Sequence, residues 1–367
     1  MAGMKELHAL GQSIWLDYIR RSMIRGGELR ELISHGLRGL TSNPSIFEKA
    51  ISGGIEYEDD LRSALQEAPD ASASVLFERL AITDIREAAD RLRRVYDESD
   101  GRDGFVSLEV SPHLAHDSTT TIAEAHRLWK LVGRPNLMIK VPATPEGVTA
   151  ISELIAAGIN VNATLMFSLA HYEVVAHAYL AGLERASDPR RIASVASFFV
   201  SRVDGIVDKQ LAAIGTAEAG KLRGRAAVAN AKMAYQRFLA IFHGSEFEVH
   251  RKRGARVQRV LFGSTSTKDP AYSDVKYVEE LIGPETVNTV PPETIEAFID
   301  HGRARLTLTE DVEGARSALA SLGDLGIDLD QVTDDLQTDG VAKFSESFDK
   351  LMAALEAKRE QLLQPAG

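Results

Sequence analysis

The chain has 367 residues, 44% of them hydrophobic and 26% charged, which is an ordinary composition for a soluble globular protein. It has no cysteine, which excludes disulfides, thiolate chemistry and cysteine-ligated metals, and its net charge of −11 argues against nonspecific nucleic-acid binding. Because no apolar run could span a membrane and the start lacks signal-peptide character, we expect a cytoplasmic protein without membrane or nucleic-acid partners.

Eight apolar, strand-like segments alternate with stretches of helical spacing. They cover residues 13–16, 37–41, 105–110, 137–141, 159–165, 192–199, 257–263 and 286–290. Helices are predicted over 121–131, where Thr121 and Glu124 have capping-box spacing, and over 145–157, 169–185 and 226–242. This alternation predicts an α/β fold with a parallel sheet, and eight strands is the number in a (β/α)8 TIM barrel. An open doubly wound sheet is the alternative, but its usual glycine-rich nucleotide loop is absent.

Extra helices are expected in two places outside this alternation. Residues 50–103, after the second strand, form a predicted helical insertion with helices over 57–66 and 73–98. Residues 293–367 are read as C-terminal helices, of which 344–363 is clearly amphipathic, whereas the acidic segment 323–340 is expected to be a mobile loop. All of these segments are assigned to one domain, residues 1–367.

Lys140 lies within an apolar run, Asn-Leu-Met-Ile-Lys-Val-Pro, that resembles a buried parallel strand. Burial removes water from a lysine and disfavours its charged form, and a neutral amine can attack a carbonyl to form a Schiff base. A lysine whose stem packs while its head reaches water is the competing interpretation of this segment alone.

Polar residues follow nearly every predicted strand at its carboxyl end, which is where barrels build their active sites. Singly, they are explained as helix caps, turns or surface residues, but one shared pocket explains all of them together. They are Asp17, Thr41, Ser42, Asn43, Glu109, Lys140, Asn162, Thr164, Ser197, Phe199, Arg202, the Ser264–Lys268 segment and Asn288.

Such a pocket suits Schiff-base chemistry on a ketose. Lys140 would be the nucleophile, and Asp17 and Glu109 would move protons, with Thr164 positioning a water. Asn43 and Asn162 would hydrogen-bond sugar hydroxyls, while the residues suited to binding a phosphate at the rim are Arg202, Ser264 and Lys268.

These segments resemble the transaldolase family over residues 8 to 360. The matching motifs are Trp-Leu-Asp at 15–17, Leu-Thr-Ser-Asn-Pro-Ser at 40–45, Ser-Leu-Glu-Val at 107–110, Met-Ile-Lys-Val-Pro-Ala-Thr at 138–144, Gly-Ile-Asn-Val-Asn-Ala-Thr-Leu at 158–165, Ser-Phe-Phe-Val-Ser-Arg at 197–202, and residues 264–288. The resemblance implies a (β/α)8 barrel that needs no cofactor or metal. It also implies transfer of a dihydroxyacetone unit from sedoheptulose 7-phosphate to glyceraldehyde 3-phosphate, giving erythrose 4-phosphate and fructose 6-phosphate in the non-oxidative pentose phosphate pathway.

Residue by residue, the resemblance assigns Lys140 as the Schiff-base lysine and Asp17 as the acid/base for carbon–carbon cleavage. Glu109 and Thr164 are similar to the pair that holds the catalytic water. Substrate-binding positions are matched by Thr41, Asn43, Asn162, Ser197, Phe199, Arg202 and Ser264. Ser266 departs from the family, since many relatives have a phosphate-binding arginine there, and Lys268 is the candidate replacement.

Three other interpretations of the function compete with this one. A fructose 6-phosphate aldolase of the same superfamily would be shorter and would tend to have Tyr at Phe199 and Gln at Glu109. A noncatalytic barrel would more readily have lost Lys140. A metal enzyme would depend on His113, His116 and His126, which lack the spacing of a metalloprotease motif. The sequence leaves both a monomer and a homodimer open.

Overall fold

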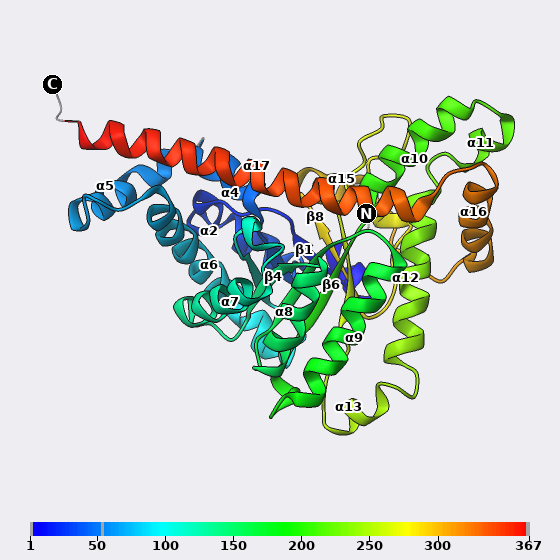
Figure 1. Cartoon of the computed structure of the whole chain (residues 1–367), viewed down its shortest axis with the longest axis horizontal. Coiled ribbons are helices and arrows are strands. Elements are labelled where there is room, and N and C mark those ends of the chain that lie inside the picture. Colours follow the sequence, from blue (N-terminus) through cyan, green and yellow to red (C-terminus); the bar gives the residue numbers. More distant parts are fainter. Residues whose placement is uncertain (1–2, 53–54, 365–367) are drawn as a thin grey trace.

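Eight parallel strands form a closed barrel in the computed structural model, which describes residues 3–52 and 55–364 (Figure 1). Each strand pairs with the next along the chain, and β1 closes the barrel against β8, with Trp15 opposite Thr289. The strands are β1 Gln12–Leu16, β2 Gly39–Thr41, β3 Phe105–Glu109, β4 Leu137–Pro142, β5 Val161–Met166, β6 Ser194–Phe199, β7 Arg259–Gly263 and β8 Thr286–Val290. The predicted TIM barrel is confirmed.

Helices surround the barrel and fill its connections (Figure 1). The helices predicted over 169–185, 226–242 and 73–98 have those limits in the structure. The α-helices are α1 Met4–Ala9, α2 Arg21–Gly26, α3 Glu28–Ser34, α4 Pro44–Ser52, α5 Glu58–Glu67, α6 Ala73–Glu98, α7 Ser118–Val132, α8 Pro145–Ala156, α9 Leu169–Arg185, α10 Ser201–Ile214, α11 Ala217–Leu222, α12 Ala226–Phe242, α13 Glu248–Lys252, α14 Lys276–Glu279, α15 Pro292–His301, α16 Val312–Asp324 and α17 Leu329–Leu363.

Helix α7 begins earlier than its predicted capping box. The backbone N–H of Thr120 donates to the carboxylate of Asp117 at 3.0 Å, so Asp117 is the N-cap. Thr121 lies inside the helix, and its hydroxyl donates to the carbonyl of Leu114 at 2.9 Å. The capping-box prediction at Thr121 and Glu124 was wrong because an aspartate upstream supplies the cap.

Residues 323–340 are mostly helical, contrary to the predicted loop. Helix α17 starts at Leu329, is capped by Asp328, and continues unbroken for 35 residues. Its buried residues include Val332, Leu336, Gly340 and Phe344, which follow one another at the four-residue spacing of a helix face. That stripe packs α17 against the barrel domain and outweighs the loop-like composition. Figure 1 shows α17 running across one face of the molecule, where it contacts α4, α6 and α10.

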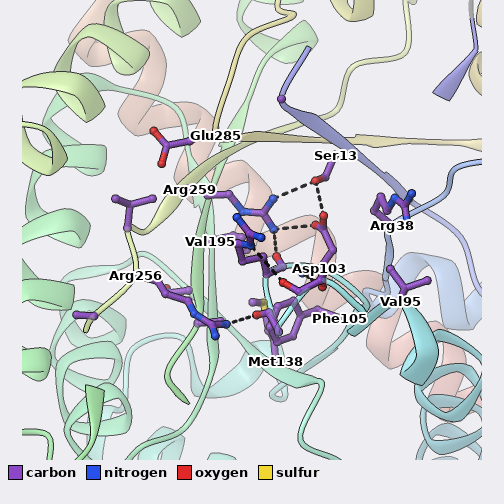
Figure 2. A pocket seen from close by; sticks show the side chains of 18 of the residues that line it. Ser13, Arg38, Val95, Asp103, Phe105, Met138, Val195, Arg256, Arg259 and Glu285 are labelled. Atoms are coloured by element: carbon purple, nitrogen blue, oxygen red, sulfur yellow. Dashed lines mark hydrogen bonds and ion pairs between the residues drawn. The ribbon is translucent and has the colours of Figure 1, made fainter. Parts of the chain in front are cut away.

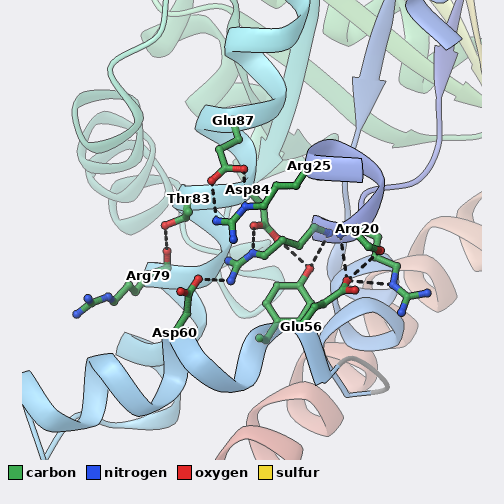
Figure 3. A network of polar contacts seen from close by, with 11 residues as sticks. Arg20, Arg25, Glu56, Asp60, Arg79, Thr83, Asp84 and Glu87 are labelled. Carbon is green, nitrogen blue, oxygen red and sulfur yellow. Dashed lines mark hydrogen bonds and ion pairs between the residues drawn. The ribbon is translucent and has the colours of Figure 1, made fainter. Parts of the chain in front are cut away.

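The insertion after β2 is attached to the barrel through a buried ion pair (Figure 3). The Nε of Arg21 on α2 lies 2.8 Å from a carboxylate oxygen of Asp84 on α6, and both side chains are at most 2% exposed. The hydroxyl of Tyr57 donates to the other oxygen of Asp84 at 2.8 Å, and Arg21 also pairs with Asp60. Both oxygens of Asp84 accept hydrogen bonds, which offsets the cost of burying the charges, although the buried Nη2 of Arg21 has no hydrogen-bond partner among the described residues.

The buried side chains form one large cluster under the helices and a second cluster inside the barrel. The inner cluster consists of Trp15, Phe105, Met138, Ala193, Val195, Leu261 and Val287.

The predicted limits 1–367, 50–103 and 293–367 include residues 1–2, 53–54 and 365–367, which lie outside the described residues. Within the described part, no helix combines the length and the apolar character needed to cross a bilayer.

Candidate active site

A cavity of about 690 Å³ opens where the strands end. Four residues predicted for the shared pocket, Ser42, Glu109, Asn162 and Asn288, are not part of its lining. The predicted residues that do line it are Asp17, Thr41, Asn43, Lys140, Thr164, Ser197, Phe199, Arg202, Ser264 and Lys268. The shared pocket inferred from strand-end polarity is therefore present.

Lys140 is buried beside Glu109. These residues are register partners on β4 and β3, so neighbouring strands bring them together. The Lys140 Nζ lies 3.1 Å from Glu109 Oε2, with the two side chains 5% and 3% exposed, and donates to the carbonyl of Ser42 at 3.3 Å. Burial raises the pKa of Glu109 despite the opposing charge of Lys140, and Asp17 adds to the rise. Glu109 is thus a proton acceptor in direct contact with the amine.

Asp17 follows β1 and is oriented by the next strand. The hydroxyl of Thr41, in β2, donates to Asp17 Oδ1 at 2.9 Å. The backbone N–H of Asp17 donates to Val290 of β8, which fixes the residue from the other side. A half-buried carboxylate therefore lines the same cavity as the Lys140 amine.

Asn162 lies beneath the cavity within a chain of side-chain hydrogen bonds. Its Nδ2 donates to Ser107 Oγ at 3.0 Å, and its Oδ1 accepts from Ser197 Oγ at 2.6 Å. Asn162 is fully buried, whereas Ser197 also lines the cavity. Two residues further along β5, the hydroxyl of Thr164 is buried without a hydrogen-bond partner among the described residues, as is Glu109 Oε1.

Asn43 has a structural task at the rim. Its Oδ1 accepts from the backbone N–H of Ile46 at 2.9 Å, so it caps the start of α4. Only its amide N–H groups remain to bind a sugar hydroxyl. The turn-and-cap interpretation and the substrate-binding interpretation of this residue are therefore compatible.

The other end of the cavity has an exposed lysine and a largely buried arginine. Arg202 stands in the first turn of α10, 5.3 Å from the Phe199 ring, and its Nη1 is buried without a hydrogen-bond partner within residues 3–52 and 55–364. Burial lowers the pKa of Arg202, and the carboxylates of Asp339 and Asp17 oppose this. Lys268 is exposed and donates to Ser266 at 2.7 Å. An arginine at a helix start suits an anion.

The loop after β7 is fixed to α10. Ser264 has a left-handed φ of 54°, a strained value for serine, and its Oγ lies 3.0 Å from Ser201 Oγ at the start of α10. Further along, the hydroxyl of Tyr277 donates to Asp204 of α10 at 2.8 Å. Burial raises the pKa of Asp204 to about 6, although hydrogen bonds from Ala227 and Tyr277 oppose the rise.

Helix α17 contributes residues that the sequence did not indicate. The ring of Phe344 lines the cavity and lies 5.5 Å from Lys140 Nζ. Gln337 Nε2 donates to the carbonyls of Ala143 at 3.1 Å and Leu165 at 2.9 Å, which follow Lys140 and Thr164 along the chain. Phe344 was predicted on an amphipathic face, but nothing in that pattern says which cavity the face covers.

Two of the three histidines considered for a metal site, His113 and His116, contact carboxylates near the surface. His113 lies 2.8 Å from Asp349 of α17, and His116 lies 3.3 Å from Glu146. Both side chains are about half or more exposed, at 49% and 69%. Each therefore takes part in a separate surface contact.

Comparisons with known proteins agree with this geometry. Residues 14–355 match the family model described as "Transaldolase/Fructose-6-phosphate aldolase". The chain is 48% identical over 356 residues to a transaldolase of Thiobacillus denitrificans, covering 96% of this chain and 99% of that protein. It is also similar to transaldolases of Parafrankia, 48% identical with 98% of both chains covered, and Trichodesmium erythraeum, 44% identical with 97% of both covered.

Proposed function

The chain belongs to the transaldolase/fructose-6-phosphate aldolase family and has the activity of a transaldolase, and from this premise we propose how its own residues carry out the reaction. The observation that carries the proposal is the contact between the buried Lys140 amine and Glu109 in a cavity that Asp17 also lines. The proposed substrates are sugar phosphates, and the proposed location is the cytoplasm.

The reaction begins with a proton transfer from Lys140 to Glu109. Burial raises the pKa of Glu109, so its carboxylate can take this proton from the amine that it contacts. The neutral Nζ then adds to the C2 carbonyl of the ketose donor, and an amine proton moves to the carbonyl oxygen to give a carbinolamine. Protonated Glu109 returns its proton to the carbinolamine hydroxyl, which leaves as water, and the nitrogen lone pair forms the iminium ion. The buried hydroxyl of Thr164 and Oε1 of Glu109 are two groups with hydrogen-bonding capacity for that water.

Asp17 is the acid/base for the carbon–carbon bond. Its carboxylate takes the proton of the C4 hydroxyl, the C3–C4 bond breaks, and an aldose leaves while the electron pair forms an enamine on Lys140. The enamine carbon adds to the aldehyde of the acceptor, and Asp17 returns the proton to the new hydroxyl. Hydrolysis of the iminium ion frees the product ketose. Thr41 orients Asp17 through its hydrogen bond.

The phosphate of the substrate is assigned to the α10 end of the cavity. Arg202 offers a guanidinium whose Nη1 has no hydrogen-bond partner in the described part of the chain, and Ser264 and Lys268 line the same end. A guanidinium fork binds phosphate through two hydrogen bonds. Asn43, Ser197 and Phe199 line the space between this end and Lys140.

Borohydride trapping tests the proposal. The protein is incubated with fructose 6-phosphate, reduced with borohydride and analysed by peptide mass spectrometry. We expect an adduct of dihydroxyacetone mass on Lys140, its loss in Lys140→Ala, and its retention in Lys268→Ala, which removes a lysine of the same cavity. Addition of an aldehyde acceptor before reduction should remove the adduct and form a new ketose. A folded protein with no adduct would refute the mechanism.

A further inference from the structure

A second cavity, of about 720 Å³, lies at the opposite end of the barrel from the active site (Figure 2). Its wall is made from residues at or just before the starts of strands, including Arg38 before β2, Asp103 before β3 and Arg259 at the start of β7. Phe105 is the first residue of β3 and Met138 is the second residue of β4. Both are buried and line this cavity. This amino-terminal end of a TIM barrel is not the end that carries catalysis.

The lining of this cavity has more positive than negative charge on a chain of net charge −11. Two of its three carboxylates pair with arginines, Asp103 with Arg259 at 3.0 Å and Glu98 with Arg94 at 2.6 Å, and Glu285 contacts the imidazole of His243 at 2.6 Å. The guanidiniums that line the cavity and form no ion pair with a carboxylate among the described residues are those of Arg38, Arg102 and Arg251. The uncompensated charge of the cavity is therefore positive.

Part of the wall is a rigid frame for these arginines. Arg259 donates to Ser13 at 3.0 Å and to Asp103, and Ser13 donates to Asp103 at 2.9 Å (Figure 2). Arg256 donates to the backbone carbonyls of the turn before β3. In contrast, the Nε of Arg38 is buried and has no hydrogen-bond partner within the described chain. A buried guanidinium nitrogen without an acceptor is costly unless a ligand supplies one.

The surroundings of His8 show that these positive charges converge. His8 lies on α1 and lines the cavity. Burial lowers its pKa, and Arg38, Arg259 and Arg102 lower it further, opposed by Asp103. Three guanidiniums from the approaches to β2, β3 and β7 thus act on one imidazole. A ligand seated among them would be anionic.

We propose that this cavity binds a small phosphorylated molecule, held by Arg38 and Arg102 at a site separate from the active site. A phosphate group accepts the forked hydrogen bonds of guanidinium groups and carries enough negative charge to balance two of them. The cavity has the volume of sites that take small metabolites, and its lining includes the half-buried Arg38 and the exposed Arg102. Inorganic phosphate and a phosphate monoester share this chemistry, and the experiment separates them.

Titration calorimetry with inorganic phosphate and, separately, with glycerol phosphate tests the site, because neither probe has a carbonyl for Lys140. We expect two sites per chain for the preferred probe. Arg38→Gln and Arg102→Gln should each weaken one of them by about tenfold or more, the loss of a charge-assisted hydrogen bond, while Arg202→Ala weakens the other. Tighter binding of glycerol phosphate identifies a phosphorylated metabolite, and tighter binding of phosphate identifies the free ion.

His8 supplies a second readout that does not depend on activity. Histidine titration by NMR, assigned with His8→Gln, should show its pKa rise when the probe binds and also in Arg38→Gln, because each change reduces the positive potential. Arg62→Gln, on exposed α5, is the matched control and should leave both measurements unchanged. A single site that Arg202→Ala abolishes, or a His8 pKa that the probe does not move, would overturn the proposal. Neither result would bear on trapping at Lys140.

Discussion

At the residue scale, Lys140 and Glu109 form a buried ion pair, and in the proposed mechanism a proton moves from the amine to the carboxylate. They contact each other at 3.1 Å and share nearly complete burial. Asn162 and Ser197, which the sequence placed among the substrate contacts, are joined to each other at 2.6 Å. They hold the strands beneath the amine in register. The chemistry therefore rests on a polar layer inside the barrel as well as on the residues that reach the cavity.

Replacing Glu109 by glutamine should separate its proposed role as a proton acceptor from the proposed role of Lys140 as the nucleophile. The amide keeps the shape of the side chain but cannot take the proton of Lys140, so we expect kcat to fall by about 10²–10⁴, the range for a general base. Borohydride trapping at high substrate should still label Lys140, only more slowly, because the nucleophile is retained. Rapid-quench measurement of adduct formation checks this. Wild-type rates in Glu109→Gln would contradict a role for Glu109 as proton acceptor.

Much of this site could be predicted because the sequence shows polar residues at the carboxyl ends of its apolar strand segments. Asp17, Lys140 and Arg202 all follow or end apolar runs, so their convergence in one cavity follows from the barrel alone. Phe344 and Gln337 could not be found this way. They reach the cavity because of the course of α17 in space, and a helical pattern specifies a buried face but not its partner.

At the element scale, the limits of α6, α9 and α12 were predicted more closely than those of β5, β6 and β7. Helix α9 ends at Arg185, which is the last residue of the helix predicted from the sequence. Strands β5, β6 and β7 each begin two residues later than the apolar segments that predicted them. Ile159 and Ile192 precede their strands and are nevertheless buried, at 2% and 1% exposed. The buried part of the chain therefore begins before the hydrogen-bonded strand does. An apolar pattern predicts which residues are buried but not where the strand starts.

Phe344 on α17 should affect catalysis through its ring above Lys140. We expect Phe344→Leu to lower kcat/KM by about tenfold, or about 1.4 kcal/mol, because the ring would lose a cation–π contact with the iminium ion proposed to form at Lys140. Phe348→Leu is the matched control, because Phe348 packs on Phe77 and His113 instead. Steady-state kinetics on both variants, with circular dichroism to verify folding, decides the matter. Equal losses in the two variants would mean that α17 acts only by holding the fold together.

Asp204, which joins α10 to the segment after β7, should make stability depend on pH. Its pKa of about 6 in the folded protein lies above the ordinary value of 3.8, so the folded state binds more protons between these values. This contribution is therefore fully present below pH 4 and is lost as the pH rises to about 6, at a cost of up to about 3 kcal/mol. Urea unfolding of wild type and Asp204→Asn across pH 4–7 measures it. Curves that stay parallel would contradict the shift.

At the scale of the whole molecule, one buried ion pair joins the helical insertion to the barrel. The side chains of Arg21 and Asp84 are both buried, so the loss of Asp84 would leave the buried Nε of Arg21 without its acceptor, with only the more exposed Asp60 still paired with this guanidinium. Because this contact crosses between the insertion and the barrel, we expect the two parts to unfold together as a single domain. The segments after β8 are joined to the same core through α17.

Asp84→Asn should therefore destabilise the whole protein by about 3–5 kcal/mol, the cost of breaking a buried pair. Asp90→Asn on the same helix is the control, because its ion pair with Arg134 is exposed and should contribute less than about 1 kcal/mol. Denaturant unfolding followed by tryptophan fluorescence and by far-ultraviolet circular dichroism should give coincident transitions. Two separated transitions in the wild-type protein would contradict the single-domain assignment.

The closure of the barrel by β1 and β8 has a consequence for the order in which the chain is made. Gln12 of β1 donates to Thr286 of β8, a residue 274 positions further along. On the ribosome, β1 must keep an unpaired edge until β8 has emerged, and such edges invite association with other chains. Lys140 also emerges long before Phe344 can lie over it. A nascent chain paused between these points would expose its reactive amine, and its need for protection by chaperones should be greatest there.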